Sequence, residues 1–323
     1  MKIARYIAAL ICVPMLMSTA NAEDWPTRPL RIVVPFPAGG SADVQSRLIA
    51  SELQTSLGQP VVVENKPGAG GNIAAAYAAH AEADGYTLFM GTTGTNASNV
   101  SLYKALEFDP VKDFAPLTLV TFNPQLVISG LKHKETGLSD LIANLKVAGA
   151  AASYGSSGIG SATHLAGELF NRVTGTAMVH VPYRGQGPAL NDLLGGRLDT
   201  MFPLVADVLS FAQSGNVKVF AIMSDQRAKT LPNVPTTAEL GYPALRLSPI
   251  WTALYTVAGT PKPIVDRLNH ELVRIIGSPQ FKDKFETLGY DIRSSSPEEL
   301  AAFGAAETAR WGEIIRTLNV HLE

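Results

Sequence analysis

Glycine-rich turns that directly follow apolar, strand-like runs are the features of this chain best suited to bind a ligand. The first turn is Pro37-Ala38-Gly39-Gly40-Ser41, which follows the run Arg31-Ile32-Val33-Val34-Pro35. Glycines lack a Cβ atom, so a carboxylate can approach the backbone N–H groups closely, and the following helix adds its positive dipole end. We therefore expect Gly39, Gly40 and Ser41 to bind an anion, with an ordinary tight turn as the alternative.

A second glycine turn, Gly68-Ala69-Gly70-Gly71, follows the apolar run Pro60-Val61-Val62-Val63-Glu64. Gly70 and Gly71 suit the same role, and a purely structural turn is again the alternative. The turn resembles the start of a dinucleotide-binding motif, but Ile73 stands where the third glycine is needed. A dinucleotide is therefore not expected, and the sequence predicts no other cofactor.

A third turn, Gly155-Ser156-Ser157-Gly158-Ile159-Gly160, opens the second half of the chain. The hydroxyls of Ser156 and Ser157 can donate to a carboxylate, and Gly158 completes the turn. Thr163 is the predicted N-cap of the next helix, and capping that helix is the alternative role of this segment. The spacing is not G-x-S-x-G, so a serine nucleophile is not supported.

Polar side chains near the ends of predicted strands are further candidates. Thr92 and Thr93 follow a strand-like run and either reach the ligand or close a local turn. Asn123 lies at a predicted crossover, where it contacts the ligand or bridges a hinge. Arg184 can form a two-pronged contact with a second carboxylate, unless it is simply exposed to solvent.

Some aromatic residues are candidates for stacking on a ligand, and one pair of residues has the spacing of metal ligands. Phe36, Phe202 and Trp251 can stack on an aromatic ligand, although aromatic residues at strand ends more often belong to the core. His164 and Glu168 have the i, i+4 spacing of metal ligands, but the sequence offers no third ligand. No metal site is therefore expected.

The turns belong to a pattern of strands and helices that occurs twice, which predicts two similar α/β lobes. The alternation of strands with helices favours mainly parallel sheets with helices on both faces. The continuous apolar runs at 32–34 and 61–63 predict strands buried on both faces. Ser41 is the predicted N-cap of the first helix. Prolines interrupt strand-like runs near 122–125 and 247–251, where we expect the chain to cross between lobes.

The N-terminus has the form of a secretory signal. Lys2 and Arg5 precede an apolar run, and Ala20-Asn21-Ala22 offers small residues for cleavage after Ala22. Cys12, the only cysteine, lies in this run, so the predicted mature chain has no disulfide. Loss of Lys2 and Arg5 changes the net charge from −2 to −4, which argues against nucleic acid as a partner. The run is too short for a permanent membrane span.

The chain resembles a family of periplasmic solute receptors. The resemblance covers essentially the whole predicted mature chain and rests on strings that match in order: Trp25-Pro26, Pro35-Phe36-Pro37-Ala38-Gly39-Gly40, Val63-Glu64-Asn65-Lys66-Pro67-Gly68-Ala69-Gly70-Gly71-Asn72, Asp84-Gly85-Tyr86-Thr87-Leu88, Tyr154-Gly155-Ser156-Ser157-Gly158, Thr163-His164-Leu165-Ala166-Gly167-Glu168, His180-Val181-Pro182-Tyr183-Arg184-Gly185, Leu194-Gly195-Gly196, Val234-Pro235-Thr236 and Ala258-Gly259-Thr260-Pro261. These strings are similar to those of the receptors of tripartite tricarboxylate transporters, also called Bug proteins.

The resemblance implies a type II periplasmic-binding-protein fold, a two-lobed flytrap that closes on a dicarboxylate or aromatic carboxylate. The implied partners are this acid and the membrane permease subunits of the transporter. One lobe would comprise residues 23–122 and 252–323, and the other residues 123–251. In the family an Asp or Asn often follows Met-Phe in the second lobe, but Pro203 follows Met201-Phe202 here, which favours a more apolar acid.

The sequence therefore predicts a periplasmic binding protein rather than an enzyme. A secreted hydrolase that uses the same cleft and a sensory subunit that signals the closed state are the alternatives. The predicted ligand-binding residues come from both lobes and from the crossover: Phe36, Pro37, Ala38, Gly39, Gly40, Ser41, Gly70, Gly71, Thr92, Thr93, Asn123, Ser156, Ser157, Gly158, Thr163, His164, Arg184 and Phe202.

Overall fold

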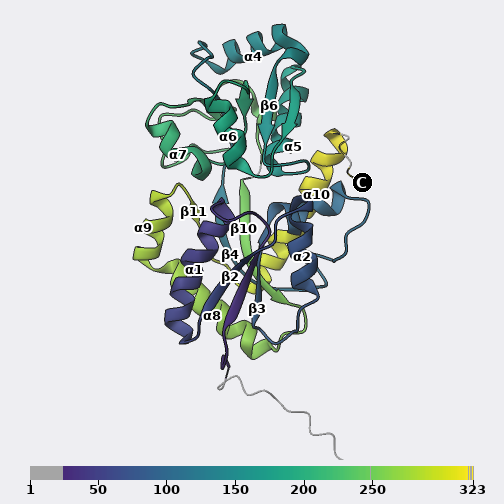
Figure 1. The fold of residues 1–323 in the computed structure, drawn as a ribbon, viewed down its shortest axis with the longest axis vertical. Helices are drawn as coiled ribbons and strands as arrows, with labels where there is room; N and C mark the ends of the chain where they lie inside the picture. The colour runs from purple at the N-terminus through teal and green to yellow at the C-terminus, as the bar shows by residue number, and fades with distance from the viewer. Residues whose placement is uncertain (1–24, 248, 319, 321, 323) are drawn as a thin grey trace, which may run out of the picture.

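The computed structural model describes residues 25–247, 249–318, 320 and 322. The predicted signal segment, residues 1–22, lies outside this range. Figure 1 shows two α/β lobes, one above the other, each built around its own sheet. The two lobes that the internal repeat predicts are therefore present.

The first lobe contains a six-stranded sheet in the order β11-β4-β10-β3-β1-β2, counted over the described residues. Its strands are β1 Leu30–Val34, β2 Val61–Asn65, β3 Thr87–Thr92, β4 Phe114–Asn123, β10 Ile250–Val257 and β11 Asp291–Ile292. Strand β1 pairs in parallel with β2 and β3, whereas β10 runs antiparallel to both β3 and β4.

The second lobe contains a sheet whose described strands follow the order β7-β6-β8-β5-β9. Its strands are β5 Leu126–Ser129, β6 Ser153–Ser156, β7 Val179–Pro182, β8 Thr200–Met201 and β9 Lys218–Ile222. Strand β6 pairs in parallel with β7 and β8, and β5 pairs antiparallel with β8 and β9.

Both sheets are thus mixed, and the expectation of mainly parallel sheets was wrong for the strands next to the crossings. Within each repeat the strands are joined by helices and run parallel, as the β-α-β order requires. Strands β5 and β10 are instead the first strands after the chain crosses from the other lobe. In the described part of the chain, no helix joins them to a neighbouring strand, so they can run antiparallel to their neighbours.

Strand β2 also departs from the sequence prediction. The run 61–63 was expected to be buried on both faces, but Val62 is 55% exposed. The prediction was wrong because β2 is the edge strand of its sheet. A run of valines does not reveal which strand lies at the edge. The run at 32–34 is fully buried, as predicted.

Helices cover both faces of both sheets. Their bounds are α1 Ser41–Leu57, α2 Asn72–Ala79, α3 Asn99–Leu102, α4 Leu138–Ala148, α5 Ala162–Thr174, α6 Gln186–Leu194, α7 Val205–Gln213, α8 Lys262–Gly277, α9 Pro279–Thr287 and α10 Pro297–Leu318. Short helical turns are η1 Ala69–Gly71, η2 Gly94–Ser98, η3 Gly149–Ala151 and η4 Pro243–Leu245. Successive β1 residues point to opposite faces, so Ile32 packs in the cluster with α1, α8 and α9, and Val33 in the cluster with α2 and α10.

The chain passes between the sheets at two adjacent places. It leaves the first sheet at Asn123 and enters the second at Leu126; it returns between Ile222 and Ile250. Asn123 and Ile250 are paired in the ladder between β4 and β10, so the two crossings lie side by side. In Figure 1 the last helix, α10, runs along the first lobe, and it also contacts α5 of the second lobe.

The lobes also meet beside the crossings, where the turn before β11 packs on α7. A Cβ atom added at Gly289 would lie 3.1 Å from Leu209 Cδ2 and 3.2 Å from Ala206 Cα, so there is little room in this contact. Asp207, in the first turn of α7, lies next to Ala206. Burial raises the pKa of the Asp207 carboxyl to about 7.

The raised pKa of Asp207 predicts a pH-dependent stability. Between about pH 4 and pH 7 the folded protein holds a proton that the unfolded chain has lost, so stability falls as the pH rises through this window. The variant Asp207→Asn cannot ionise. We expect its advantage over the wild type to widen by about 1–2 kcal/mol between pH 5 and pH 8, allowing for residual solvent at the side chain. Urea unfolding at both pH values measures this difference.

The matched control is Asp140→Asn, because Asp140 is an exposed carboxylate in the first turn of α4. Its effect on stability should not change over the same pH range in the way that Asp207→Asn does. Equal pH dependence of the wild type and Asp207→Asn would contradict the raised pKa of this carboxyl.

Candidate functional site

The turn between β1 and α1 is held by its own carboxylate. Asp43 accepts hydrogen bonds from Gly39 N (2.9 Å) and from Arg47 Nε (2.9 Å), and Asn65 Nδ2 donates to its other oxygen (3.0 Å). Burial acts to raise the pKa of Asp43, but these hydrogen bonds outweigh it and leave the pKa lowered. Gly39, whose φ is +81°, therefore shapes the turn, and its N–H is already used. This corrects the expectation that its N–H binds the ligand.

The donors that remain in this turn lie at the start of α1. The helix begins at Ser41 with Gly40 as its N-cap, so the prediction of Ser41 as N-cap was wrong by one residue. The first N–H groups of a helix have no acceptor within the helix. The N–H groups of Ser41, Ala42 and Asp43, together with the Ser41 hydroxyl, therefore form a compact group of donors at the positive end of a 17-residue helix.

The remaining residues of this turn have supporting places. The Phe36 side chain is partly buried against the first-lobe core, and its carbonyl accepts from Asn65 Nδ2 (3.0 Å). Gly40 N donates to Pro37 O at 3.3 Å, which closes the turn, and Ala38 is exposed. These contacts fix the backbone of the turn.

In the second lobe the turn between β6 and α5 is stabilised by its own hydroxyls. Ser157 N donates to Thr163 Oγ1 (2.9 Å), and Gly158 N donates to Ser156 Oγ (3.1 Å). Ser161 rather than Thr163 is the N-cap of α5, since its side chain accepts from His164 N. Thr163, predicted to be the cap, holds Ser157 instead.

Two histidines, His164 and His180, lie behind this turn. Their rings stack with centroids 4.1 Å apart, and the Tyr154 ring stacks on His180. His164 Nδ1 accepts from Gly160 N (3.1 Å), which requires this nitrogen to be unprotonated. Burial lowers the pKa of His164, although Glu168 opposes this effect, and burial together with the neighbouring His164 ring lowers the pKa of His180 to about 4. His164 thus shapes the turn in its neutral form.

The metal hypothesis finds no support in the side chains near His164. Its Nε2 lies 3.9 Å from Glu168 Oε1, while that oxygen accepts from Tyr154 Oη at 2.5 Å. Among the described residues, no group of three or more His, Cys, Asp or Glu side chains is placed to hold a metal ion.

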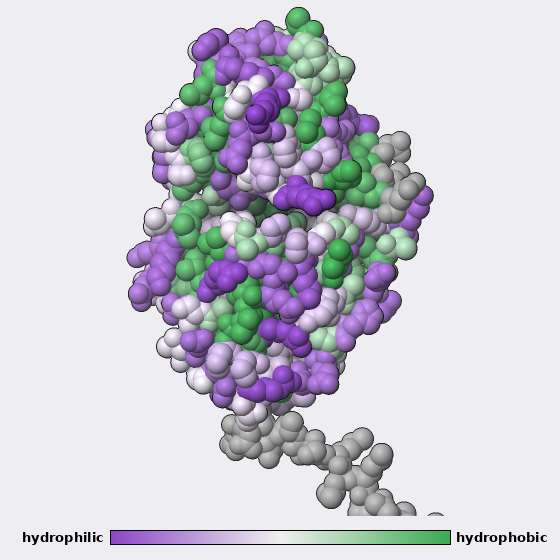
Figure 2. Space-filling model, in the orientation of Figure 1, coloured by the Kyte–Doolittle hydropathy of each residue, from purple (hydrophilic) through white to green (hydrophobic). Residues whose placement is uncertain are grey.

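The turns of the two lobes face each other. A Cβ atom added at Gly185, in the turn between β7 and α6, would lie 3.9 Å from Pro37 Cγ. One added at Gly160 would lie 3.6 Å from Tyr103 Oη of the first lobe. Arg184 is exposed beside Gly185, and Figure 2 shows a recess in the surface where the lobes meet. The strand ends of both sheets therefore border one space.

The second glycine turn packs more tightly than a ligand wall requires. A Cβ atom added at Gly70 would lie 2.7 Å from Tyr103 Oη, and one at Gly71 would lie 2.7 Å from Thr95 Cγ2. Both glycines have positive φ, at 62° and 96°. They allow this turn to lie against the segment that begins at Thr95, next to the place where Gly160 approaches from the other lobe.

Thr92, Thr93 and Asn123 lie at the crossings. Thr93 Oγ1 accepts from Trp251 N (2.9 Å), and Thr92 N donates to Thr95 Oγ1 (3.0 Å). Asn123 is 1% exposed; its Nδ2 donates to Thr121 Oγ1 (3.1 Å), and its Oδ1 has no partner among the described residues. The threonines therefore brace the ends of β3 and β10, and Asn123 keeps a free acceptor.

The side chain of Phe202 is a core residue, which corrects its prediction as a surface for ligand stacking. It is fully buried, with its ring centroid 5.1 Å from that of Phe170 and 5.8 Å from that of Tyr154. Trp251 is also fully buried and packs edge-to-face on Phe303. The strand-end position gave no signal that distinguishes a core aromatic residue from an exposed one.

Two further polar residues beside these turns were not among the predicted site residues. Gln45 is fully buried one helical turn after Ser41, to which it donates a hydrogen bond. Both polar atoms of the Gln186 amide, at the start of α6, are buried without a partner among the described residues. The i, i+4 spacing of Ser41 and Gln45 was the one available hint.

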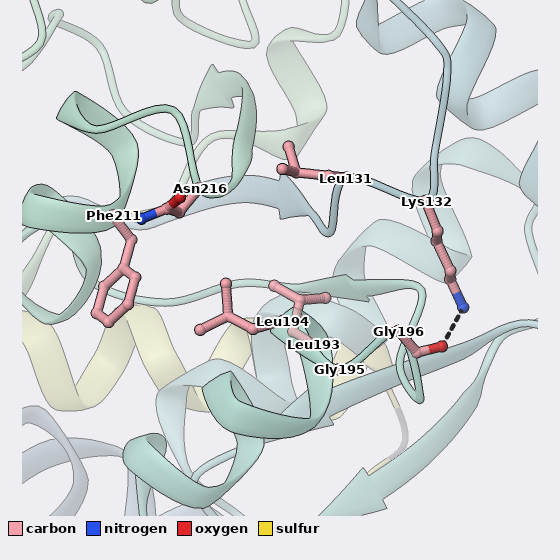
Figure 3. Close-up of a pocket in the computed structure, with 8 residues that line it drawn as sticks. All are labelled: Leu131, Lys132, Leu193, Leu194, Gly195, Gly196, Phe211 and Asn216. Carbon is pink, nitrogen blue, oxygen red and sulfur yellow. Dashed lines mark hydrogen bonds between the residues drawn. The ribbon is translucent and has the colours of Figure 1, made fainter.

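A cavity of about 410 Å³ lies elsewhere in the second lobe, as Figure 3 shows. It is lined by Leu131, Leu193, Leu194 and Phe211, and Lys132 Nζ donates to the Gly196 carbonyl (2.9 Å). It follows the carboxyl end of β5, which runs antiparallel to β8. The cavity therefore lies at the end of the second-lobe strands that is opposite to the turns facing the first lobe.

The chain is similar to known proteins over nearly its whole length. A family model described as "Tripartite tricarboxylate transporter family receptor" matches residues 45–320. BugT from Bordetella pertussis (strain Tohama I) is 36% identical over all of this chain and 99% of its own length. Within the described residues, no helix has the length and apolar character needed to cross a membrane.

Two solved structures share the fold over nearly their whole length. "R. palustris Rpa4515 with adipate" has a TM-score of 0.88 at 34% identity, over 92% of this chain and 99% of its own. The periplasmic binding protein BugD has a TM-score of 0.87 at 34% identity, over 93% of this chain and 100% of its own. The predicted two-lobed binding-protein fold is thereby confirmed, and this chain belongs to the tripartite tricarboxylate transporter receptor family.

Proposed function

We propose that this protein captures a small carboxylate between its lobes and delivers it to the permease subunits of a tripartite tricarboxylate-type transporter. The observation that carries the proposal is the approach of Gly185 to Pro37, which sets a second-lobe turn opposite the donors at the start of α1. The adipate described for a structural relative supports a dicarboxylate as ligand.

The ligand-binding step follows from these donors. A carboxylate that binds at the start of α1 receives hydrogen bonds from fixed N–H groups and the Ser41 hydroxyl, which require little rearrangement. Its far end then meets Arg184 and the turn that contains Ser156, Ser157 and Gly158. Closure is favoured only by the extra affinity of the ligand for the closed form, and a change from mostly open to mostly closed takes about 5.5 kcal/mol.

The proposed lobes are residues 23–122 with 252–323, and residues 123–251, with the hinge near 122–125 and 247–251. Adjacent crossings support this, because two connections that lie side by side permit the lobes to bend about one axis. We further propose cleavage after Ala22 and residence of the mature protein in the periplasm, as for BugD.

Binding without catalysis fits the second-lobe turn better than hydrolysis does. Ser156 Oγ lies 2.6 Å from His180 Nε2, which superficially resembles a nucleophile and its base. However, Ser156 is fully buried, and burial lowers the pKa of His180 to about 4, so this imidazole is a weak base at neutral pH. We therefore propose a structural role for this pair.

Calorimetric titration of the ligand-free mature protein with succinate, adipate, L-malate, citrate and benzoate tests the proposed function. We expect saturable one-site binding of at least one of these acids, because the donors at the start of α1 are specific for an anion. The control is the uncharged amide of the best acid, which should release no heat. Absence of binding by every acid would contradict the proposal.

Arg184 provides a more specific prediction. If its guanidinium binds the second carboxylate, Arg184→Gln should weaken adipate binding about tenfold, as expected for a charge-assisted hydrogen bond. Binding of hexanoate, which has six carbons and one carboxylate, should change little. Titration with both acids gives the comparison.

Arg172→Gln is the matched control, since Arg172 is an exposed arginine in the last turn of α5, at the opposite end of that helix from the turn that faces the first lobe. It removes the same charge and should leave both acids unaffected. An equal loss for adipate and hexanoate in Arg184→Gln would mean that Arg184 does not contact the second carboxylate.

A further inference from the structure

A buried chain of hydrogen bonds runs beneath the start of α1. Gln45 Nε2 donates to Ser41 Oγ (3.1 Å), and Gln45 Oε1 accepts from Thr252 Oγ1 (2.6 Å) and Thr121 Oγ1 (3.3 Å). The two threonines lie opposite each other on β10 and β4, with their hydroxyl oxygens 2.8 Å apart. Asn123 Nδ2 extends the chain to Thr121 (3.1 Å). We call these residues, Ser41, Gln45, Thr252, Thr121 and Asn123, the hydroxyl–amide chain.

Counting protons fixes the direction of the hydroxyl–amide chain. Each threonine hydroxyl has one proton to donate. The proton of Thr252 goes to Gln45 Oε1 at 2.6 Å. The single proton of Thr121 is therefore shared between Thr252 Oγ1 at 2.8 Å and the longer contact to Gln45 Oε1 at 3.3 Å. Thr121 must then accept from Asn123, which agrees with the unpartnered Asn123 Oδ1.

The direction of the chain determines the role of Ser41. With Gln45 Oε1 turned toward the threonines, its Nε2 has to face Ser41 Oγ, which therefore acts as an acceptor toward Gln45. The hydroxyl proton of Ser41 is then left to point away from Gln45. Ser41 is the first residue of α1, so this proton joins the N–H groups that have no partner in the helix.

Tyr290 is a further polar neighbour of Ser41. Burial raises the pKa of the Tyr290 hydroxyl to about 12, while hydrogen bonds with Ser41 and Gln45 oppose this effect. Tyr290 is therefore a neutral phenol, which competes for the Ser41 proton when no ligand is bound. A carboxylate is a much stronger acceptor because it is charged, so a bound acid takes the proton.

We propose that Gln45 is a positioning residue which, held by Thr121 and Thr252, turns the hydroxyl proton of Ser41 toward the ligand's carboxylate. The inference rests on the proposed function, since it needs a carboxylate at the start of α1. It adds that the strands next to both crossings hold the ligand-binding hydroxyl in its donor orientation.

A double-mutant cycle tests this inference. The variants are Ser41→Ala, Gln45→Met and the double variant, and the probe is whichever of the five acids named above binds the wild type most tightly. Gln45→Met keeps the length of the side chain and removes the amide. Each single variant should bind about tenfold more weakly. The double variant should lose no more than Ser41→Ala alone, because Gln45 acts only through Ser41.

Two further variants separate positioning from a general loss of structure. Thr252→Val removes the hydroxyl that holds Gln45 Oε1 and should weaken binding in the wild type but not in the Ser41→Ala background. Ser46→Ala is the matched control, because Ser46 is a fully buried serine of α1 whose hydroxyl donates to Ala42 O (2.7 Å) outside the chain. It should leave affinity unchanged.

The outcomes are distinct. Losses that add up in the Ser41→Ala/Gln45→Met double variant, or a Thr252→Val effect that persists without the Ser41 hydroxyl, would overturn the role of Gln45 and leave the proposed function intact. Should Gln45→Met fail to fold, the Thr252→Val cycle decides alone. A wild type that binds none of the five acids would instead reject the proposed function, and this inference with it.

Discussion

The adjacent crossing of two chain segments between the sheets is the constraint on which the rest of this structure depends. Strands β4 and β10 are paired up to the crossing, where Asn123 lies opposite Ile250. This pairing brings the carboxyl ends of β1, β3 and β4 to the edge of the first sheet that faces the second lobe, because β10 runs antiparallel to both β3 and β4. In α/β proteins such an edge carries the ligand-binding turns, and here two such edges share one space.

The first-lobe turn separates the task of shaping a backbone from the task of binding an anion. Asp43 takes the N–H of Gly39 and forms a two-pronged pair with Arg47, so its own negative charge is balanced within the turn. Without that pair, an ionised carboxylate in the first turn of α1 would repel an acidic ligand at the same helix end. The Asp43–Arg47 pair thus allows a carboxylate to fix the turn and leaves the N–H groups of α1 free for another anion.

The sequence predicted the elements well because local signals specify them. Gly58 and Gly175 end α1 and α5 in the left-handed conformation that glycine favours, and the repeated β-α-β order predicted both lobes. Position within a sheet was not predictable. Val62 is exposed because β2 is an edge strand, and Phe202 is buried because it packs against α5. Neither fact can be inferred from the local sequence pattern.

The ligand-binding site was also only partly predictable, because hydrogen bonds within a turn compete with hydrogen bonds to a ligand. Sequence can place a donor at the end of a strand, but it cannot say whether a nearby group already uses that donor. The N–H of Gly39 was predicted to bind the ligand, yet it is taken by Asp43, four residues further along the chain. In the second lobe the N–H of Ser157 is likewise taken by Thr163, six residues further along. Such internal acceptors make the turns rigid before any ligand arrives. A rigid turn loses little entropy on binding, so the donors used within the turn still contribute to affinity by holding the free ones in place.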